Sequence, residues 1–172
     1  MYRFAMNDLL QWKGKKNRKP LIIRGARQVG KTWLMQEFGR KYYEKYAYIN
    51  FDDNTRMNSL FNEDFNIEKI IQGLKIESGV NIEPENTLII LDEIQETPRA
   101  LKALKYFCEN AREYHVISAG SLLGVAIHEG TSFPVGKVDF MDLMPLSFFE
   151  FLDALGQKDP VSYTHLTLPT IA

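Results

Sequence analysis

Hydrophobic residues along this chain follow two alternating patterns, one typical of buried strands and the other of amphipathic helices. Residues 87–91 form a continuous apolar run of the length expected for a strand buried on both faces. Residues 67–74 instead repeat isoleucine and leucine at intervals of three and four, which places these side chains on one face of a helix. Because such segments alternate along the chain, the pattern predicts an α/β fold with a parallel sheet covered by helices on both faces.

The predicted elements follow one another in a regular order. Residues 57–65 give only a weak signal, and residues 122–136 contain the glycines and proline of a loop. The expected strands are residues 21–23, 47–51, 87–91, 114–119 and 137–141, and the expected helices are residues 2–12, 30–46, 67–78, 98–111 and a last one that begins at residue 147.

Two helix starts carry local signals. Thr97 is a favourable N-cap residue, and Pro98 suits the first helical position. Ser147 and Glu150 have the spacing of a capping box, in which each side chain accepts a hydrogen bond from the other's backbone N–H. The N-terminal helix is expected to place on one face Tyr2, Met6, Leu9 and Leu10, with Trp12 nearby.

Composition and charge restrict the class of protein. The 172 residues are 45% hydrophobic and 25% charged, which is ordinary for one globular domain. The net charge of −1 provides no overall attraction to nucleic acid or acidic membranes. The longest aliphatic run, residues 88–91, is too short to span a bilayer, so we expect no membrane association and a cytoplasmic location. Cys108 excludes an internal disulfide and lies on the apolar stripe of its helix, where a core role is expected rather than a nucleophilic one.

A basic segment, residues 13–19, holds five lysines and arginines. Such a segment can contact nucleic acid or a phosphorylated partner. A solvated turn before the first strand is the more ordinary interpretation, and we favour it.

Residues 25–32 match the pattern G-x-x-x-x-G-K-T of a phosphate-binding loop, between an apolar strand and an amphipathic helix. The glycines allow the backbone N–H groups to turn toward the phosphates, and the helix that follows adds its positive dipole end. Lys31 is expected to reach the β- and γ-phosphates, and the Thr32 hydroxyl to hold Mg²⁺. The residues expected to bind the nucleotide are Gly25, Ala26, Arg27, Gln28, Val29, Gly30, Lys31 and Thr32.

Two carboxylates follow the most apolar strand. Asp92 is expected to hold Mg²⁺ together with Thr32, directly or through water. Glu93 is expected to lie beside the γ-phosphate and orient the attacking water, which favours ATP hydrolysis over nucleotide binding alone.

Other candidates have weaker support. Ser121 follows the fourth strand and is our candidate for sensing the γ-phosphate and holding the water; Ser118 is the alternative, and both could be ordinary loop serines. Arg27 could contact phosphate, a neighbouring subunit or only solvent. Arg99 and Arg112 are possible arginine fingers in trans, but neither lies in a motif.

Two absences restrict the ligands. No N-K-x-D motif for reading guanine occurs, so adenine is favoured. His115 and His128 have no other histidine or cysteine at ligand spacing, so zinc is not expected.

Further motifs accompany the loop and the acid pair, and the whole set covers residues 24–32, 48–52, 89–95, 118–124, 133–137 and 143–152. Together these segments resemble a group of prokaryotic AAA+ ATPases, the archaeal-type ATP-binding proteins that carry an uncharacterised C-terminal domain. The resemblance implies a three-layer P-loop NTPase sandwich with a five-stranded parallel sheet in the order 5-1-4-3-2. It also implies the roles given above for Lys31, Thr32, Asp92, Glu93 and Ser121.

The end of the chain departs from this family, whose members continue into a helical lid and a C-terminal region. Residues 158–172 resemble a non-native tail, so we expect the natural chain to continue further. The expected organisation is an N-terminal helix and basic turn over residues 1–20, an ATPase core over residues 21–157, and that tail.

Two functions from different classes remain open at this point. The first is an enzyme that binds Mg-ATP and hydrolyses it to ADP and phosphate, coupled to a C-terminal domain, with an oligomer possible in the full-length protein. The second is a nucleotide-dependent switch that docks a protein or nucleic-acid partner with little hydrolysis. A small-molecule kinase would need an acceptor pocket and an arginine-bearing lid, and the sequence shows neither.

Overall fold

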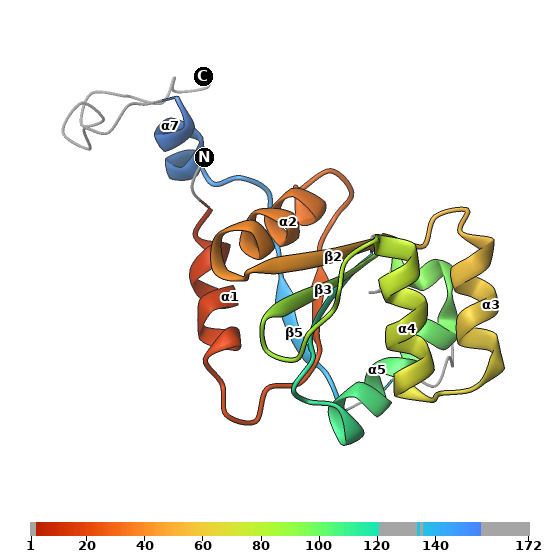
Figure 1. Cartoon of the computed structure of the whole chain (residues 1–172). Helices are drawn as coiled ribbons and strands as arrows, with labels where there is room; N and C mark the ends of the chain where they lie inside the picture. Colours follow the sequence, from red (N-terminus) through yellow and green to blue (C-terminus); the bar gives the residue numbers. More distant parts are fainter. Residues whose placement is uncertain (1–2, 121–133, 135, 156–172) are drawn as a thin grey trace, which may run out of the picture.

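A parallel sheet forms the centre of the computed structural model, which describes residues 3–120, 134 and 136–155 (Figure 1). The described sheet has five strands in the order β2-β3-β4-β1-β5, and every neighbouring pair is parallel. This confirms the predicted order 5-1-4-3-2, counted from the opposite edge. The strands are β1 (Leu21–Arg24), β2 (Lys45–Asn50), β3 (Thr87–Asp92), β4 (His115–Ala119) and β5 (Asp139–Asp142).

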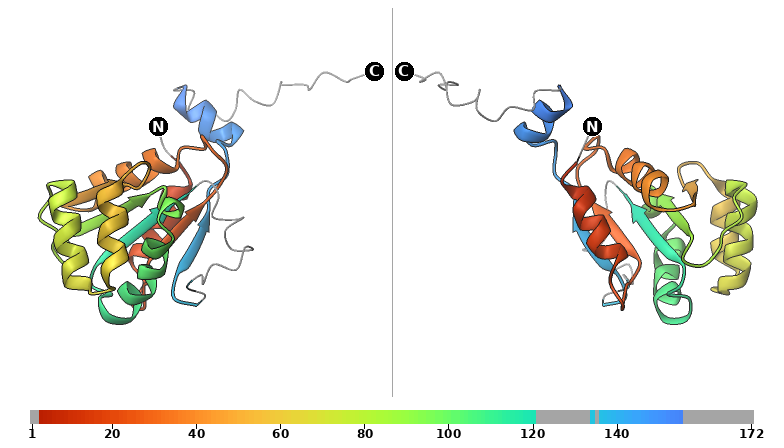
Figure 2. Two further views of the ribbon diagram at one scale, coloured as in Figure 1. Left: turned by 90° about the vertical axis from the view of Figure 1, so that its right-hand side faces the viewer. Right: turned by 60° about the vertical axis from the view of Figure 1, so that its left-hand side comes forward.

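Helices cover both faces of the sheet, which confirms the three-layer architecture (Figures 1 and 2). α1 and α2 pack on one face, and α3, α4 and α5 pack on the other. α7 lies away from both layers, close to the N-terminal end of the chain (Figure 2). The described helices are α1 (Ala5–Lys13), α2 (Lys31–Tyr42), α3 (Thr55–Glu63), α4 (Ile67–Ser78), the 3₁₀ helix η1 (Ile94–Glu96), α5 (Pro98–Asn110) and α7 (Phe148–Ala154).

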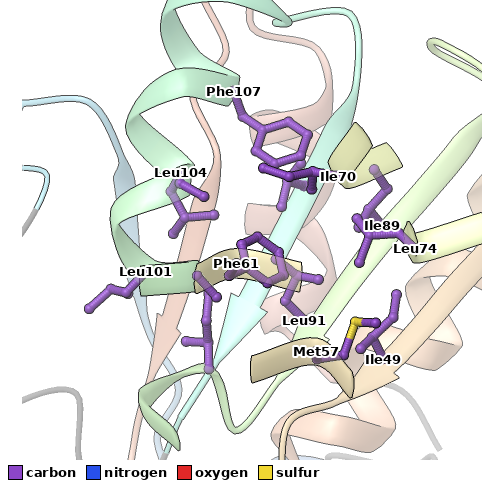
Figure 3. Packing of buried hydrophobic residues seen from close by; sticks show 14 of the residues in the cluster. Ile49, Met57, Phe61, Ile70, Leu74, Ile89, Leu91, Leu101, Leu104 and Phe107 are labelled. Carbon is purple, nitrogen blue, oxygen red and sulfur yellow. The ribbon is translucent and has the colours of Figure 1, made fainter. Parts of the chain in front are cut away.

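Alternation along β1 shows why the central strands are apolar throughout. Leu21 and Ile23 face the core beside α1 and α2, whereas Ile22 faces the core beside α3 to α5. All six residues of β3 are likewise buried. Side chains from α3, α4 and α5 fill the core on the face of the sheet that these helices cover, and they include Phe61, Leu104 and Phe107 (Figure 3). Cys108 is buried in α5, as expected of a core residue.

α3 is the helix that the sequence did not reveal. Only two of its nine residues, Met57 and Phe61, are buried, so its periodic signal is short. A side-chain cap marks its start: Asn54 accepts a hydrogen bond from the Met57 backbone N–H at 3.1 Å. The weak signal over residues 57–65 therefore reflected a helix with a narrow buried face.

Several element boundaries differ from the predictions, by one to four residues. α2 ends at Tyr42 rather than near residue 46, because Tyr43 adopts an extended backbone and β2 begins two residues later. Tyr46 then packs directly on Gly39, where a Cβ would lie only 2.7 Å from the Tyr46 Cβ. In α1 the expected face is also partly wrong, since Leu10 is exposed while its neighbour Leu9 is buried.

The two predicted caps have different outcomes. Thr97 occupies the N-cap position before Pro98, but its hydroxyl donates to the Asn58 side chain rather than capping α5. The capping box of α7 is formed: the Ser147 N–H donates to Glu150 Oε2 at 2.8 Å, and the Glu150 N–H donates to Ser147 Oγ at 3.3 Å.

Candidate functional site

The predicted site residues lie at the edge of the sheet where the parallel strands end. β1 leads into the phosphate-loop residues 25–30, and β3 ends at Asp92, with β4 between these two strands. In open parallel sheets, ligands bind outside the carboxyl ends of the strands, so this edge is the expected location of a nucleotide site. Ser121, His128 and residues 158–172 lie outside the described residues.

The two glycines of the loop are required for different reasons. Gly30 has a φ of 90°, in the left-handed region that glycine adopts without strain. Gly25 instead meets a packing constraint, because a Cβ at this position would lie 2.4 Å from the Leu143 carbonyl oxygen. The sequence prediction that both glycines serve the curl of the loop is thus incomplete: Gly25 also admits the backbone that follows β5.

Lys31 lies folded against the loop. Its Nζ donates to the carbonyl oxygens of Gly25 at 2.9 Å and Ala26 at 2.7 Å, and only 7% of the residue is exposed. Burial lowers the pKa of the Lys31 ammonium, although the negative charges of Glu93 and Asp92 oppose this shift. The lysine is therefore held inside the loop by acceptors that phosphate oxygens could replace.

The fold brings Thr32, in the first turn of α2, into contact with Asp92, the last residue of β3. The Thr32 hydroxyl donates to Asp92 Oδ2 at 2.6 Å. The same oxygen accepts a hydrogen bond from the Tyr48 hydroxyl at 3.1 Å, and Asp92 Oδ1 accepts the Glu93 backbone N–H at 3.1 Å. Burial and the adjacent Asp92 charge raise the pKa of Tyr48, so its hydroxyl stays protonated and donates.

Glu93 adopts a backbone conformation that is uncommon for its residue type. Its φ is 51°, in the left-handed region, directly after β3. Gln95 Nε2 donates to Glu93 Oε2 at 2.6 Å, so η1 holds the carboxylate. Gln95 Oε1 is buried and has no hydrogen-bond partner within the part of the chain that the structure describes. Left-handed backbone conformations such as that of Glu93 occur often at functional sites.

The remaining arginine and serine candidates have other contacts. Ser118 is fully buried, and its hydroxyl donates to the Leu21 carbonyl at 3.2 Å, so it lies inside the sheet. Arg99 Nε donates to the Phe61 carbonyl at 2.7 Å, and Arg112 Nε donates to the Cys108 carbonyl at 2.5 Å. Arg27 is exposed on the loop.

Sequence reasoning missed the roles of Tyr48 and Gln95 around the two acids. Tyr48 lies in β2, beside β3, two residues before the position paired with Asp92. Given the strand order, a tyrosine at that register is a signal for a contact with the β3 carboxyl end. Gln95 offered no comparable signal, because its contact with Glu93 depends on the turn after β3.

The sheet order, the helices on both faces and the loop after β1 define the P-loop NTPase fold class. Within that class, a sequence profile of the AAA domain matches residues 17–152, and the chain belongs to this family. The resemblance to an AAA+ ATPase core is thereby confirmed. None of the curated proteins matches the chain.

Solved structures with the same fold include two archaeal proteins. The Walker-type ATPase of Pyrococcus abyssi is 16% identical with a TM-score of 0.57, over 91% of this chain and 57% of that one. The ORC1 protein of Aeropyrum pernix, solved in complex with DNA, is 15% identical with a TM-score of 0.55, over 88% of this chain and 47% of that one. The chain thus spans about half the length of these structures.

Among the described helices, none has the length and apolar character needed to cross a membrane.

Proposed function

We propose that the chain binds ATP with Mg²⁺ at the carboxyl edge of the sheet and hydrolyses it to ADP and phosphate. The observation that carries this proposal is the 2.6 Å hydrogen bond between Thr32 Oγ1 and Asp92 Oδ2. It joins a hydroxyl of the phosphate loop to a carboxylate at the end of a buried strand. These are the oxygen ligands that Mg²⁺ prefers in such sites.

The oxygen groups of the site suit Mg²⁺, and its N–H and ammonium groups suit the phosphates of a nucleotide. Thr32 and Asp92 would hold Mg²⁺, whose charge would offset that of the phosphate oxygens. The backbone N–H groups of residues 25–32 would cradle the phosphates, and Lys31 would exchange its two carbonyl acceptors for phosphate oxygens. Ser121 remains the predicted residue for sensing the γ-phosphate.

Glu93 would act on the attacking water. Its carboxylate directly follows Asp92 and would orient the water and accept its proton during attack. In the structure this carboxylate is bonded to Gln95 at 2.6 Å. The bond occupies one acceptor position of the carboxylate and holds it against η1, which competes with the water and favours slow basal hydrolysis.

The same bond keeps a second function open: a nucleotide-dependent switch that binds a protein or nucleic-acid partner. Nucleotide titration and steady-state phosphate release, with Mg²⁺ and with EDTA, separate the two functions. Mg²⁺-dependent binding with phosphate release supports the ATPase, and Mg²⁺-dependent binding without release supports the switch. Failure to bind ATP in either condition would contradict both.

A further inference from the structure

Arg3 connects three segments that are far apart in the sequence. Only 3% of the residue is exposed. Its Nη1 donates to the Val29 carbonyl at 3.1 Å, its Nη2 to the Met144 carbonyl at 2.8 Å, and its Nε to Glu150 Oε1 at 3.1 Å. One guanidinium therefore binds the phosphate loop, the segment after β5 and the first turn of α7.

The contact with Val29 fixes the orientation of one peptide group in the phosphate loop. The peptide bond is planar and trans, so the Val29 C=O and the Gly30 N–H point in opposite directions. Because Arg3 binds the carbonyl, the N–H is directed away from Arg3. A Cβ on Gly30 would lie 3.6 Å from Arg3 Nη1, so the guanidinium is in contact distance of the loop backbone. Arg3 thus holds one donor of the loop in place.

Glu150 completes the connection at the other end. Besides Arg3, its Oε1 accepts the Phe4 backbone N–H at 2.8 Å, and its Oε2 accepts the Ser147 N–H at 2.8 Å. Burial acts to raise the pKa of Glu150, but the hydrogen bonds from Ser147 and Phe4 and the charge of Arg3 outweigh it and lower the pKa. The capping-box glutamate is therefore an ionised partner for Arg3, and α7 is bound to it through its own first turn.

We propose that Arg3 and Glu150 form a buried latch that couples the conformation of the phosphate loop to the position of α7. The inference rests on the proposed nucleotide binding. A buried ion pair with several oriented hydrogen bonds tolerates little displacement, so a rotation of the 29–30 peptide must move Arg3, and Glu150 must follow or lose its partner. Coupling is reciprocal: if nucleotide shifts the position of α7, then a change that displaces α7 must alter nucleotide affinity in turn.

The test measures the nucleotide response of α7 in the full chain. Hydrogen exchange of the amides in residues 148–155 is followed with and without Mg²⁺ and a nonhydrolysable ATP analogue. The variants are Arg3→Met, which keeps most of the side-chain length but loses the donors, and Glu150→Gln, which is isosteric. In the wild type we expect nucleotide to change α7 exchange, and in both variants we expect that response to disappear.

Affinity provides the second readout. Each single variant should weaken analogue binding by about 5- to 150-fold, the usual range of coupling between sites, and the double variant should be no weaker than the worse single one. Lys137→Met is the matched control, because it breaks the exposed Lys137–Glu109 ion pair, at 2.8 Å. It should keep both the affinity and the α7 response.

The outcomes separate this inference from the proposed function. If the wild type binds the analogue but α7 exchange does not change, or if both variants keep the response, the latch is wrong while nucleotide binding stands. If the wild type does not bind the analogue, the proposed function and the latch both fail. If the melting curve shows that Arg3→Met does not fold, the α7 response of the isosteric Glu150→Gln alone tests the latch.

Discussion

The hydroxyl of Thr32 lies 2.6 Å from a carboxylate oxygen of Asp92, although 60 residues separate them in the sequence. The contact forms because β1 and β3 are parallel strands of one sheet and both end at the same edge. Tyr48 holds the same oxygen from a third strand. The two predicted metal ligands are therefore already adjacent.

The first prediction concerns Lys31, whose ammonium lies inside the loop. At an ATP concentration of 100 Kd, binding should stabilise the wild type by about 2.7 kcal/mol, or roughly 5–10 °C in melting temperature for a chain of this size. Lys31→Ala removes the cation that would bind the phosphates and should abolish this shift. Lys41→Ala is the control, because Lys41 lies in the last turn of the same helix and pairs with Glu37. This variant should keep the ATP-induced shift. An equal ATP-induced shift in Lys31→Ala would mean that the nucleotide site lies elsewhere.

The features that the sequence predicted are those set by local patterns. The central strands, the loop between β1 and α2 and the acids at the end of β3 depend on short runs of residues, and the structure has each of them at the predicted position in the fold. α3 and the end of α2 were not, because a two-residue buried face and the packing of Tyr46 on Gly39 depend on tertiary contacts. The contact between Arg3 and Glu150 joins residues 147 positions apart, and no local pattern indicates it.

The second prediction concerns the basic segment, residues 13–19. Much of its charge is bound within the fold: Lys13 lies over the Tyr43 ring, and Arg18 donates to the Lys13 carbonyl at 2.8 Å. Lys19 donates to the Gly136 carbonyl at 2.7 Å. We therefore expect only weak binding of a labelled oligonucleotide in fluorescence anisotropy, falling steeply between about 50 and 200 mM salt. Tight binding that persists above 200 mM salt would contradict this.

The third prediction concerns His115, whose ring is buried and whose Nδ1 lies 2.7 Å from the Tyr43 hydroxyl. Burial first, then the charges of Arg18 and Lys13, lower the pKa of His115 from 6.5 to about 3. Between these values the unfolded chain binds a proton that the native chain does not. The free energy of unfolding should therefore fall as pH falls below about 6.5, with a slope of up to ~1.4 kcal/mol per pH unit from this residue.

Urea unfolding at pH 7.5 and pH 5.5 tests this, in a range where most carboxylates stay ionised. His115→Phe should be less stable at pH 7.5, because it leaves the Tyr43 hydroxyl without its partner, but should lose less stability on acidification than the wild type. Tyr43→Phe keeps the histidine buried and should retain most of the pH dependence. An unchanged pH dependence in His115→Phe would show that His115 is not the group responsible.

The last prediction separates the two acids at the end of β3. Asp92 accepts hydrogen bonds from Thr32 and Tyr48 on one oxygen. Asp92→Asn removes the negative charge and can place an amide donor opposite two hydroxyl donors, so it should weaken Mg²⁺-dependent ATP binding. Glu93→Gln should leave binding within a few-fold, because the proposed role of Glu93 concerns the water and not the metal.

Hydrolysis should depend on Glu93 even though ATP binding does not. Groups that orient or deprotonate water contribute about 10²–10⁴-fold to rate, so Glu93→Gln should lose most single-turnover hydrolysis while its site still fills with nucleotide. The side chain keeps its size and an oxygen acceptor, and Gln95 can still donate to that oxygen, so a change in fold does not account for the loss. Glu68→Gln, an exposed carboxylate on α4, is the control and should hydrolyse ATP at the wild-type rate. If the wild type hydrolyses ATP and Glu93→Gln does so equally fast, Glu93 does not activate the water, and another group in the chain must.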